Sequence, residues 1–306
     1  MGTRRIHLLV RVSLYPPYRV IFIVQSEIRN QIILFSLCFD PQSEIRNPKL
    51  RGVSMVLTQQ EGPVATLTIN RPEVLNTLTH ELILRLTEEI RRWSAEKAVR
   101  VIVLTGSGDK AFVGGVDVKA MMDLDPDGAE RFITDLHRCF LAVRQSEKLV
   151  IASINGFALG GGLELVASCD LRIASDRARF GMPEVRVGIP SVIEAAILPR
   201  LMGLGRAAEM VYLGEMIDAR EAWRIGLVNK VVPHEQLKEA TRQMAEKALQ
   251  CGPTAMVQQK KLIAQWMDLS LSDAAEAGIR AFRECYKTAE PGEGMKAFLE
   301  KRKPKY

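Results

Sequence analysis

The 306-residue sequence has few histidines and no regular arrangement of cysteines. Its four histidines lack the spacing of metal ligands, and no two of its five cysteines form a C-x-x-C pair. These absences speak against a zinc site and a disulfide framework, so we expect no metal. Dispersed, unpaired thiols are typical of a protein in a reducing compartment, and we expect a cytoplasmic location.

Long apolar runs and a strong charge on the body of the chain are also missing. No run approaches the roughly 18 apolar residues that cross a bilayer, so we expect no membrane partner. The net charge of +6 comes mostly from residues 1–54, which hold eight Lys/Arg and three Asp/Glu and leave 34 basic and 33 acidic residues for the remainder. A nearly neutral body argues against a nucleic-acid partner.

Residues 1–54 differ in pattern from the rest of the chain. The hexapeptide QSEIRN occurs at 25–30 and again at 42–47, and the aliphatic stretches around it match neither an amphipathic helix nor a well-bounded hairpin. A transit peptide is one interpretation, although the repeat does not suit it. We favour a disordered or non-native extension of translated upstream sequence, with the functional protein beginning at Met55.

From Met55 onward, strand patterns alternate with helical ones. Apolar, β-branched stretches predict strands at 64–69, 99–106, 149–156 and 171–175. Apolar residues at helical spacing between the first two, with Thr79 as a cap, predict a helix. Strands alternating with helices favour an α/β fold with a mainly parallel sheet, and the chain after residue 218 reads as almost wholly helical.

Two glycine-rich stretches are suited to presenting backbone N–H groups. In AFVGGVD, 111–117, paired glycines follow a strand, and a tight turn is the alternative interpretation. In GFALGGGLE, 156–164, three glycines begin a helical run, where free N–H groups and the positive end of the helix dipole favour an oxygen that gains negative charge. The G-x-G-x-x-G spacing of dinucleotide-binding loops is absent.

Two carboxylates accompany these glycines. Glu164 lies one turn into the glycine-led helix, and Glu184 lies in a loop-like stretch rich in glycine and proline. A paired acid and base suits proton transfer to a substrate held between them. Alternatively, Glu184 caps a turn and Glu164 pairs with an arginine such as Arg172 or Arg179. A third carboxylate, Glu194, either reaches the same cavity or begins a helix.

Taken together, six motifs in this order resemble the crotonase superfamily and most closely enoyl-CoA hydratase. They are NRPEVLNTL (70–78), AFVGGVDVKAM (111–121), INGFALGGGLELVASCDLRIAS (154–175), ARFGMPEVRVGI (178–189), RIGLVNKVVP (224–233) and FLEKRK (298–303). The resemblance implies a crotonase (ClpP-like) fold: a repeated ββα spiral core over 55–230 and a C-terminal helical oligomerisation region over 231–306, forming a homotrimer or hexamer.

The resemblance also implies a reaction and its residues. Backbone N–H groups of Gly114 and Gly161 bind the thioester oxygen of an acyl-CoA, Glu164 acts as base toward water, and Glu184 gives the proton to the α-carbon. The enzyme is then a lyase of fatty acid metabolism that turns 2-enoyl-CoA into 3-hydroxyacyl-CoA without a metal or redox cofactor. An isomerase or another acyl-CoA enzyme of the fold is the alternative, and a non-catalytic acyl-CoA or RNA-binding member is less favoured.

Contacts to coenzyme A follow from the same resemblance. They fall on the chain after the first oxyanion donor, at Gly115, Val116, Asp117 and Lys119. Others fall on the last helix, often from a neighbouring subunit, at Phe298 and Lys301. Where hydratases usually have a glycine-rich segment, this chain has PSVIEAAILPR, 190–200, which we expect to reshape the acyl pocket near Glu184.

Overall fold

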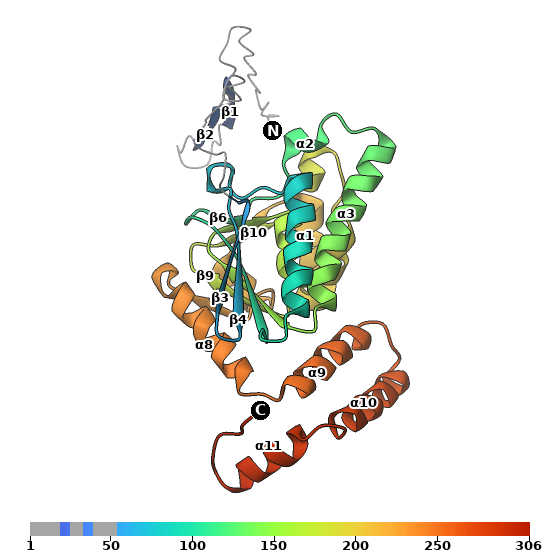
Figure 1. Cartoon of the computed structure of the whole chain (residues 1–306). Helices are drawn as coiled ribbons and strands as arrows, with labels where there is room; N and C mark the ends of the chain where they lie inside the picture. The colour runs from blue at the N-terminus through green and yellow to red at the C-terminus, as the bar shows by residue number, and fades with distance from the viewer. Residues whose placement is uncertain (1–18, 25–32, 39–53) are drawn as a thin grey trace, which may run out of the picture. The chain divides into compact units, whose positions relative to one another are not determined.

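The computed structural model describes residues 19–24, 33–38 and 54–306, and the chain divides into two units, Met1–Val53 and Ser54–Tyr306 (Figure 1). In the first unit, strands β1 (Arg19–Val24) and β2 (Ile33–Cys38) pair antiparallel. The sequence pattern did not indicate this pairing. The two strands lie within the segment 1–54 that was expected to be disordered or non-native. The rest of that segment up to residue 53, with both QSEIRN repeats, lies outside the described residues.

The second unit is built around a six-stranded sheet with the order β12-β9-β7-β5-β4-β3. Its strands are β3 (Val56–Glu61), β4 (Val64–Ile69), β5 (Val101–Gly106), β7 (Leu149–Ile154), β9 (Leu171–Ser175) and β12 (Lys230–Val232). β3 and β4 form an antiparallel hairpin, and all other neighbours are parallel. β5 is apolar on both faces because helices cover both sides of the sheet there. The four predicted strands are confirmed.

A smaller sheet has the order β11-β10-β8-β6. Its strands are β6 (Ala111–Val113), β8 (Phe157–Leu159), β10 (Arg179–Gly181) and β11 (Met216–Asp218). β6, β8 and β10 are mutually parallel, and each follows a strand of the large sheet. The chain therefore repeats a strand-strand-helix unit, as expected from the sequence, and each small strand leads into a segment that carries candidate site residues.

Three helices enclose the main core. α1 (His80–Ala95) and α3 (Pro126–Gln145) lie side by side along one face of the sheet (Figure 1). α1 is capped as predicted, since the Thr79 side chain accepts a hydrogen bond from Leu82 N. α4 (Gly161–Ser168) is buried along its whole length. Its position leaves its N-terminus inside the molecule, close to the small sheet.

The opposite face of the large sheet is covered by α8 (Leu237–Leu249). Leu237 and Ala240 of this helix share an apolar cluster with Val103 and Ile151 of the sheet, and Figure 1 shows α8 across β3 and β4 from α1. The expected domain boundary after residue 230 falls inside β12. The C-terminal part is therefore not a single appendage, because α8 belongs to the packing of the sheet.

The other helices are short or lie beyond the sheet. They are α2 (Val118–Met121), α5 (Leu198–Met202), α6 (Leu204–Leu213), α7 (Ala219–Arg224), α9 (Pro253–Trp266), α10 (Leu271–Cys285) and α11 (Glu290–Leu299), with the 3-10 helices η2 (Pro72–Val74), η3 (Glu184–Val187), η4 (Ile193–Ile197) and η5 (His234–Gln236). α9, α10 and α11 extend away from the sheet (Figure 1). Within the described residues no helix has the length and apolar character of a membrane span.

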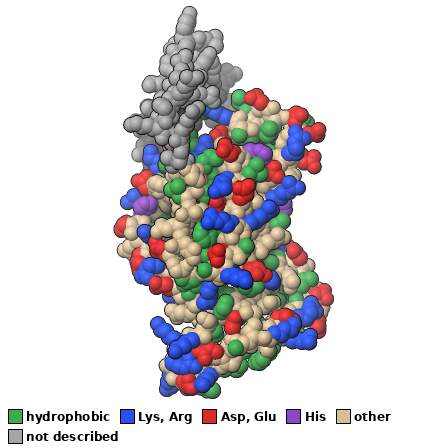
Figure 2. Space-filling view, in the orientation of Figure 1, with side chains coloured by type: hydrophobic (Ala, Val, Ile, Leu, Met, Phe, Trp, Pro, Cys, Tyr) green, Lys and Arg blue, Asp and Glu red, His purple; other side chains and the backbone are tan. Residues whose placement is uncertain are grey.

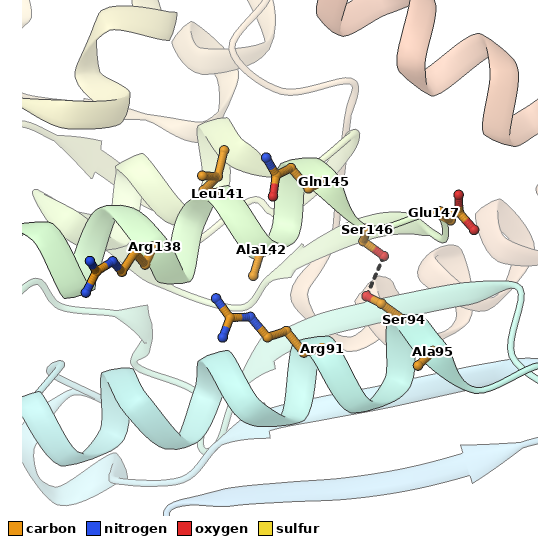
Figure 3. A pocket seen from close by; sticks show the side chains of 9 residues that line it. All are labelled: Arg91, Ser94, Ala95, Arg138, Leu141, Ala142, Gln145, Ser146 and Glu147. Atoms are coloured by element: carbon orange, nitrogen blue, oxygen red, sulfur yellow. Dashed lines mark hydrogen bonds between the residues drawn. The ribbon is translucent and has the colours of Figure 1, made fainter.

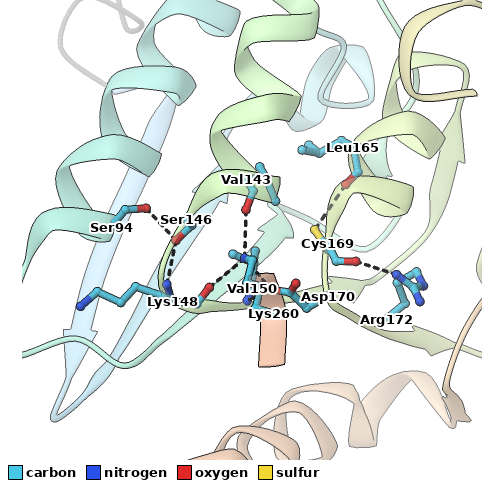
Figure 4. A network of polar contacts seen from close by, with 10 residues as sticks. All are labelled: Ser94, Val143, Ser146, Lys148, Val150, Leu165, Cys169, Asp170, Arg172 and Lys260. Atoms are coloured by element: carbon cyan, nitrogen blue, oxygen red, sulfur yellow. Dashed lines mark hydrogen bonds and ion pairs between the residues drawn. The ribbon is translucent and has the colours of Figure 1, made fainter. Parts of the chain in front are cut away.

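A polar network fastens α9 to the core (Figure 4). Lys260 Nζ donates hydrogen bonds to Asp170 Oδ2 at 2.7 Å, Lys148 O at 2.9 Å and Val143 O at 3.1 Å. Asp170 Oδ2 also accepts from Val150 N at 2.7 Å. One ammonium group thus joins α9 to the end of α3, the start of β7 and the turn after α4.

Candidate active site

An apolar cavity of about 220 Å³ lies where the two glycine-rich stretches meet. The first stretch contributes Gly114, Gly115 and Val116, and the second contributes Gly160 and Glu164. The remaining lining residues are Val118, Met121, Phe132, Ile133, Leu136, Leu159, Pro183, Glu184, Arg186, Val187, Ile189, Pro190 and Val192. Both predicted carboxylates therefore line one cavity whose walls are mostly hydrocarbon.

Glu164 is held inside the cavity wall by a backbone donor. It lies in the first turn of α4 with 3% of its surface exposed, and its Oε1 accepts a hydrogen bond from Ala195 N at 2.9 Å. The pKa of this carboxyl is raised to about 8, chiefly by burial and also by the charges of Glu184 and Glu194, while the hydrogen bond from Ala195 N lowers it. Glu164 therefore titrates near neutral pH.

The alternative in which Glu164 pairs with an arginine is not realised. Arg172 Nε donates to Leu227 O at 2.8 Å, and its Nη1 donates to Cys169 O at 2.6 Å. Arg179 Nη1 donates to the neighbouring Ala178 O at 2.9 Å. Both guanidinium groups donate to backbone carbonyls, and Glu164 forms no ion pair within residues 54–306.

Glu184, the first residue of η3, packs directly on Gly160. Its Oε2 accepts a hydrogen bond from Ser191 Oγ at 2.8 Å. A Cβ on Gly160 would stand 2.3 Å from Glu184 Oε1, and Gly160 has a φ of +51°. Glycine is required at position 160 because a side chain would collide with Glu184 and because this backbone conformation is rare for other residues. Burial raises the pKa of Glu184 above its ordinary value.

Gly161 presents a free N–H at the start of α4. Gly160 N donates to Gly181 O at 2.9 Å, and Leu163 N and Glu164 N both return to Gly160 O. Gly161 N donates to no acceptor within residues 54–306. Because this amide is also at the positive end of the helix, it is suited to an oxygen that gains negative charge.

Gly114, in contrast, does not fulfil its expected role as the other donor. Its N–H donates to Leu75 O at 2.8 Å. A Cβ at this position would lie 2.9 Å from Leu75 Cβ, so glycine is needed for the close approach of Leu75 and not for a substrate. Contrary to the sequence-based expectation, the Gly114 amide is occupied in this structure.

Val116 has the free amide instead. Leu78 N donates to Gly115 O and Asp117 N donates to Leu78 O, both at 2.9 Å, forming a parallel bridge around Val116. In such a bridge the middle residue turns its own N–H away from the partner. The Val116 N–H finds no acceptor in the part of the chain that the structure describes. Its Cγ2 would lie 3.1 Å from a Cβ on Gly161, so the two residues that carry the free amides are neighbours.

A buried asparagine fixes this arrangement, and the sequence did not single it out. Asn76 is fully buried, and its Nδ2 donates to Ala111 O at 2.8 Å and Ser107 O at 3.0 Å. Its Oδ1 accepts from Arg71 N at 2.9 Å. Leu75 and Asn76 both have a φ of 57°, a conformation that needs such support. The asparagine therefore presents Leu75 O to Gly114 and thereby sets the position of Val116.

The predicted coenzyme A residues fall into two groups. Gly115 and Val116 line the cavity, while Asp117 caps α2 by accepting from Lys119 N at 3.1 Å. Phe298 belongs to α11 and Lys301 follows it, and Figure 1 shows α11 at the end of the unit away from α2. Neither of these two lines the cavity of its own chain, so their contact with coenzyme A stays a prediction.

The hollow between α1 and α3 lacks this chemistry. It has a volume of about 300 Å³ and is bordered by Arg91, Arg138 and Glu147, with a Ser94–Ser146 hydrogen bond of 2.7 Å (Figure 3). It has no carboxyl pair and no free backbone amide pair. Among the described residues, no cluster of three His, Cys, Asp or Glu side chains could hold a metal ion.

Residues 59–306 match a protein family described as enoyl-CoA hydratase/isomerase. The chain belongs to the enoyl-CoA hydratase/isomerase family. Membership in this family accounts for the repeated strand-strand-helix units and confirms the resemblance to the crotonase superfamily. The crystal structure of enoyl-CoA hydratase from Bacillus anthracis superimposes with a TM-score of 0.80 at 34% identity, covering 83% of this chain and 99% of that one.

Two relatives in the enoyl-CoA hydratase/isomerase family are especially similar in sequence. The crotonyl-CoA hydratase of Syntrophomonas wolfei is 40% identical over 252 residues, which are 82% of this chain and 97% of that protein. The short-chain-enoyl-CoA hydratase of Clostridium acetobutylicum is 39% identical over 249 residues, covering 81% and 95%. Similarity thus extends over essentially the whole of both relatives.

Proposed function

We propose that this chain is an enoyl-CoA hydratase that adds water across the 2,3 double bond of short-chain 2-enoyl-CoA thioesters. The observation that carries the proposal is that Glu164 and Glu184 line one apolar cavity beside two free backbone amides. The names of the relatives support hydratase activity. An isomerase needs only one of the two carboxyl groups, which makes it the second candidate.

The thioester oxygen would accept hydrogen bonds from the amides of Val116 and Gly161. Negative charge develops on this oxygen when a nucleophile adds to C3, so donors placed beforehand stabilise the transition state more than the substrate. Removing one such donor typically costs about 3 kcal/mol, or on the order of a hundredfold in rate. This role replaces the one that the sequence assigned to Gly114.

The two carboxyl groups would move the protons. Glu164 takes a proton from water while the water oxygen bonds to C3, and the electron pair of the double bond shifts to C2 and the thioester as an enolate. Glu184 then releases its proton to C2. Water is consumed, one carboxyl gains a proton and the other loses one, so the charges balance. Burial raises the pKa of both groups, which helps the pair to hold one proton near neutral pH.

The cavity supports a short acyl chain. Its volume is about 220 Å³, and Phe132, Leu136 and Val192 stand in its wall. Val192 and Pro190 come from the segment that replaces the usual glycine-rich stretch, so bulkier side chains take up space next to Glu184. A panel of 2-enoyl-CoA thioesters of increasing length should show kcat/KM falling beyond the shortest members.

Hydration itself is tested with crotonyl-CoA. The conjugated enoyl-thioester absorbance should disappear as 3-hydroxybutyryl-CoA forms. Glu164→Gln and Glu184→Gln should each lower kcat by about a hundredfold or more, because each removes one proton-transfer group. Turnover of a 3-enoyl-CoA without loss of crotonyl-CoA absorbance would assign the isomerase reaction instead.

The pH dependence of kcat/KM distinguishes base from acid. Because the pKa of Glu164 is about 8 in the free site, a base at this position gains activity as pH rises toward 8. An acid at this position loses activity above pH 8. We expect the first profile, and the second would assign the base role to Glu184.

The same proposal includes self-association and a cytoplasmic location. We expect a homotrimer or hexamer in which Phe298 and Lys301 of one subunit reach coenzyme A bound to another. Support comes from the apolar side chains that α9, α10 and α11 expose, among them Trp266, Phe282 and Phe298. The cytoplasmic assignment rests on unpaired thiols, of which Cys139 and Cys169 are buried.

A further inference from the structure

One short segment, residues 191–195, contacts both carboxyl groups of the cavity. Ser191 Oγ donates to Glu184 Oε2 at 2.8 Å, and Ala195 N donates to Glu164 Oε1 at 2.9 Å. Each donor holds one oxygen of its carboxyl group. The orientation of both proton-transfer groups thus depends on where this segment lies.

The segment contains a strained residue. Ile193, the first residue of η4, has a φ of 42°, which is a rare conformation for a β-branched side chain. Such a conformation persists only where neighbouring contacts enforce it, and it is often found at functional sites. Contacts of the neighbouring residues must therefore hold Ile193 in this conformation.

The next residue, Glu194, makes such a contact from a buried position. It is 2% exposed, and its Oε1 lies 3.0 Å from His137 Nδ1 and 3.6 Å from Arg144 Nη1, both on α3. The His137 contact is close but not aligned as a hydrogen bond, and Glu194 Oε2 has no hydrogen-bond partner among the described residues. Through its contacts with His137 and with the Arg144 guanidinium, this buried carboxyl group ties η4 to α3.

We propose that Glu194 is a positioning residue for the hydration reaction: its contacts with His137 and Arg144 hold the strained turn that aims Ser191 and Ala195 at the two carboxyl groups. This inference rests on the proposed function and deepens it. It also explains why η4 carries a buried carboxylate that does not line the cavity.

Glu194 influences Glu164 in two ways that can be separated. Through the backbone it places the Ala195 N–H, which lowers the pKa of Glu164, and through its charge it raises that pKa together with Glu184. The charged or titratable groups that act on Glu194 itself are His137 and Arg144 of α3. Glu194→Gln removes the charge and retains the shape of the side chain, whereas Glu194→Ala removes both. Comparing these two variants therefore distinguishes a positioning effect from a charge effect.

The experiment compares Glu194→Gln, Glu194→Ala and Glu194→Asp with the parent enzyme on crotonyl-CoA. The glutamine retains the length and can hydrogen-bond both α3 side chains, so we expect kcat within about threefold of the parent. The alanine and the aspartate lose the contact, and we expect kcat to fall tenfold or more with KM within twofold. A loss in kcat without a change in KM indicates displaced proton-transfer groups and not a damaged binding site.

A matched control lies on the same helix. Asp135 also pairs with a histidine and an arginine, His80 at 2.9 Å and Arg138 at 3.0 Å, but its partners do not touch the segment 191–195. Asp135→Asn should keep the parental kcat and KM. Thermal unfolding of every variant, followed by circular dichroism, identifies those that are folded.

Two results would overturn the proposal. Equal kcat values for the folded alanine and glutamine variants would mean that the shape and hydrogen bonding of the side chain do not matter, and parental kcat in the aspartate variant would mean that its length does not matter. Should the alanine variant not fold, the aspartate variant, which keeps the charge, decides the question. Absence of crotonyl-CoA hydration by the parent would instead overturn the proposed function. Positioning is then tested without substrate, by NMR titration of the Glu164 carboxyl, whose pKa should be higher in the alanine variant than in the glutamine variant.

Discussion

The buried carboxyl groups of this cavity lower the stability of the fold when they are charged. Glu164 is almost completely buried without a cation, and its hydrogen bond from Ala195 offsets only part of the cost of its charge. The same burial raises its pKa into the range where a proton can be taken up or released at neutral pH. Function and stability therefore make opposite demands on this residue.

This conflict predicts a pH-dependent gain in stability for Glu164→Gln. The pKa of Glu164 is about 8 in the folded protein, against an ordinary value of 4.5. Burial of this carboxyl therefore costs the parent no ionisation free energy below pH 4.5, and the parent loses stability as the pH rises from 4.5 to 8. At about 1.4 kcal/mol per pKa unit, the variant should become more stable than the parent by a few kcal/mol at pH 8.5. Urea unfolding at pH 5 and pH 8.5 measures this, and an equal difference at both values would contradict it.

A second prediction concerns the glycine under Glu184. Gly160→Ala places a methyl group where Glu184 Oε1 now lies and forces a residue with a side chain to a φ of +51°. We expect kcat to fall on the order of a hundredfold, because Glu184 and the start of α4 must both move. Gly278→Ala is the control, since a Cβ there meets nothing within 4 Å inside α10, and it should stabilise the protein by about 1 kcal/mol.

The sequence singled out both carboxyl groups that line the cavity, but not the free amide of the first glycine-rich stretch. Glu164 stood out because a carboxylate in an apolar run is unusual in itself, and Glu184 was chosen through the resemblance to enoyl-CoA hydratase. Which amide of AFVGGVD is free depends on hydrogen bonds to Leu75 and Leu78, which lie far away in the sequence. Spacing carries no information on such pairing, so Gly114 was chosen although Val116 has the free N–H. Ser191 and Ala195 were missed for the same reason.

At the scale of secondary structure, the site depends on a few junctions where elements are fastened together. The network of Lys260 joins α9 to α3, β7 and the turn after α4 (Figure 4). Its side chain is 10% exposed and that of Asp170 is 22% exposed. Because this junction lies at the opposite end of α4 from Gly161, it contributes to stability without contacting the cavity.

Lys260→Met should therefore destabilise the protein and leave its catalysis intact. Removing the ammonium leaves the Asp170 carboxylate without its cation, and we expect a loss of about 3 kcal/mol in the free energy of unfolding with kcat unchanged. Addition of Asp170→Asn should restore part of this loss. The neighbouring Lys261→Met breaks an exposed pair with Glu147 and should cost less than about 1 kcal/mol. Equal losses for both lysine variants would contradict a special role for the buried one.

At the scale of the whole molecule, the fold could be predicted from the sequence better than the boundary between its core and its C-terminal helices. Alternating strand and helix patterns are local, and they located four strands of the large sheet and α1 correctly. The position of α8 was not predictable, since a helical pattern does not reveal which surface its apolar face covers. The expected division after residue 230 consequently cuts through β12 and assigns α8 to the wrong part of the molecule.

The exposed apolar side chains of the last three helices predict self-association. Phe282 of α10 is 66% exposed and stacks on Tyr286 with ring centroids 4.9 Å apart. Phe282→Asp should shift the protein toward monomers, because it places a charge on an apolar surface. Analytical ultracentrifugation measures the mass. Leu57→Ser, on β3, should retain the parental mass, and a monomeric parent would rule out an assembly through these helices.

The closeness of Glu164 and Glu184 has a consequence for successive turnovers. In the proposed mechanism the two carboxyl groups exchange protonation states with each hydration, so the enzyme that releases product is prepared for dehydration and not for another hydration. Before the next forward cycle, a proton must pass between them or be traded with the solvent. At high concentrations of substrate and product this resetting step can limit the exchange of isotopic label between 2-enoyl-CoA and 3-hydroxyacyl-CoA. Until the proton has moved back, the free enzyme retains the protonation state left by the last reaction.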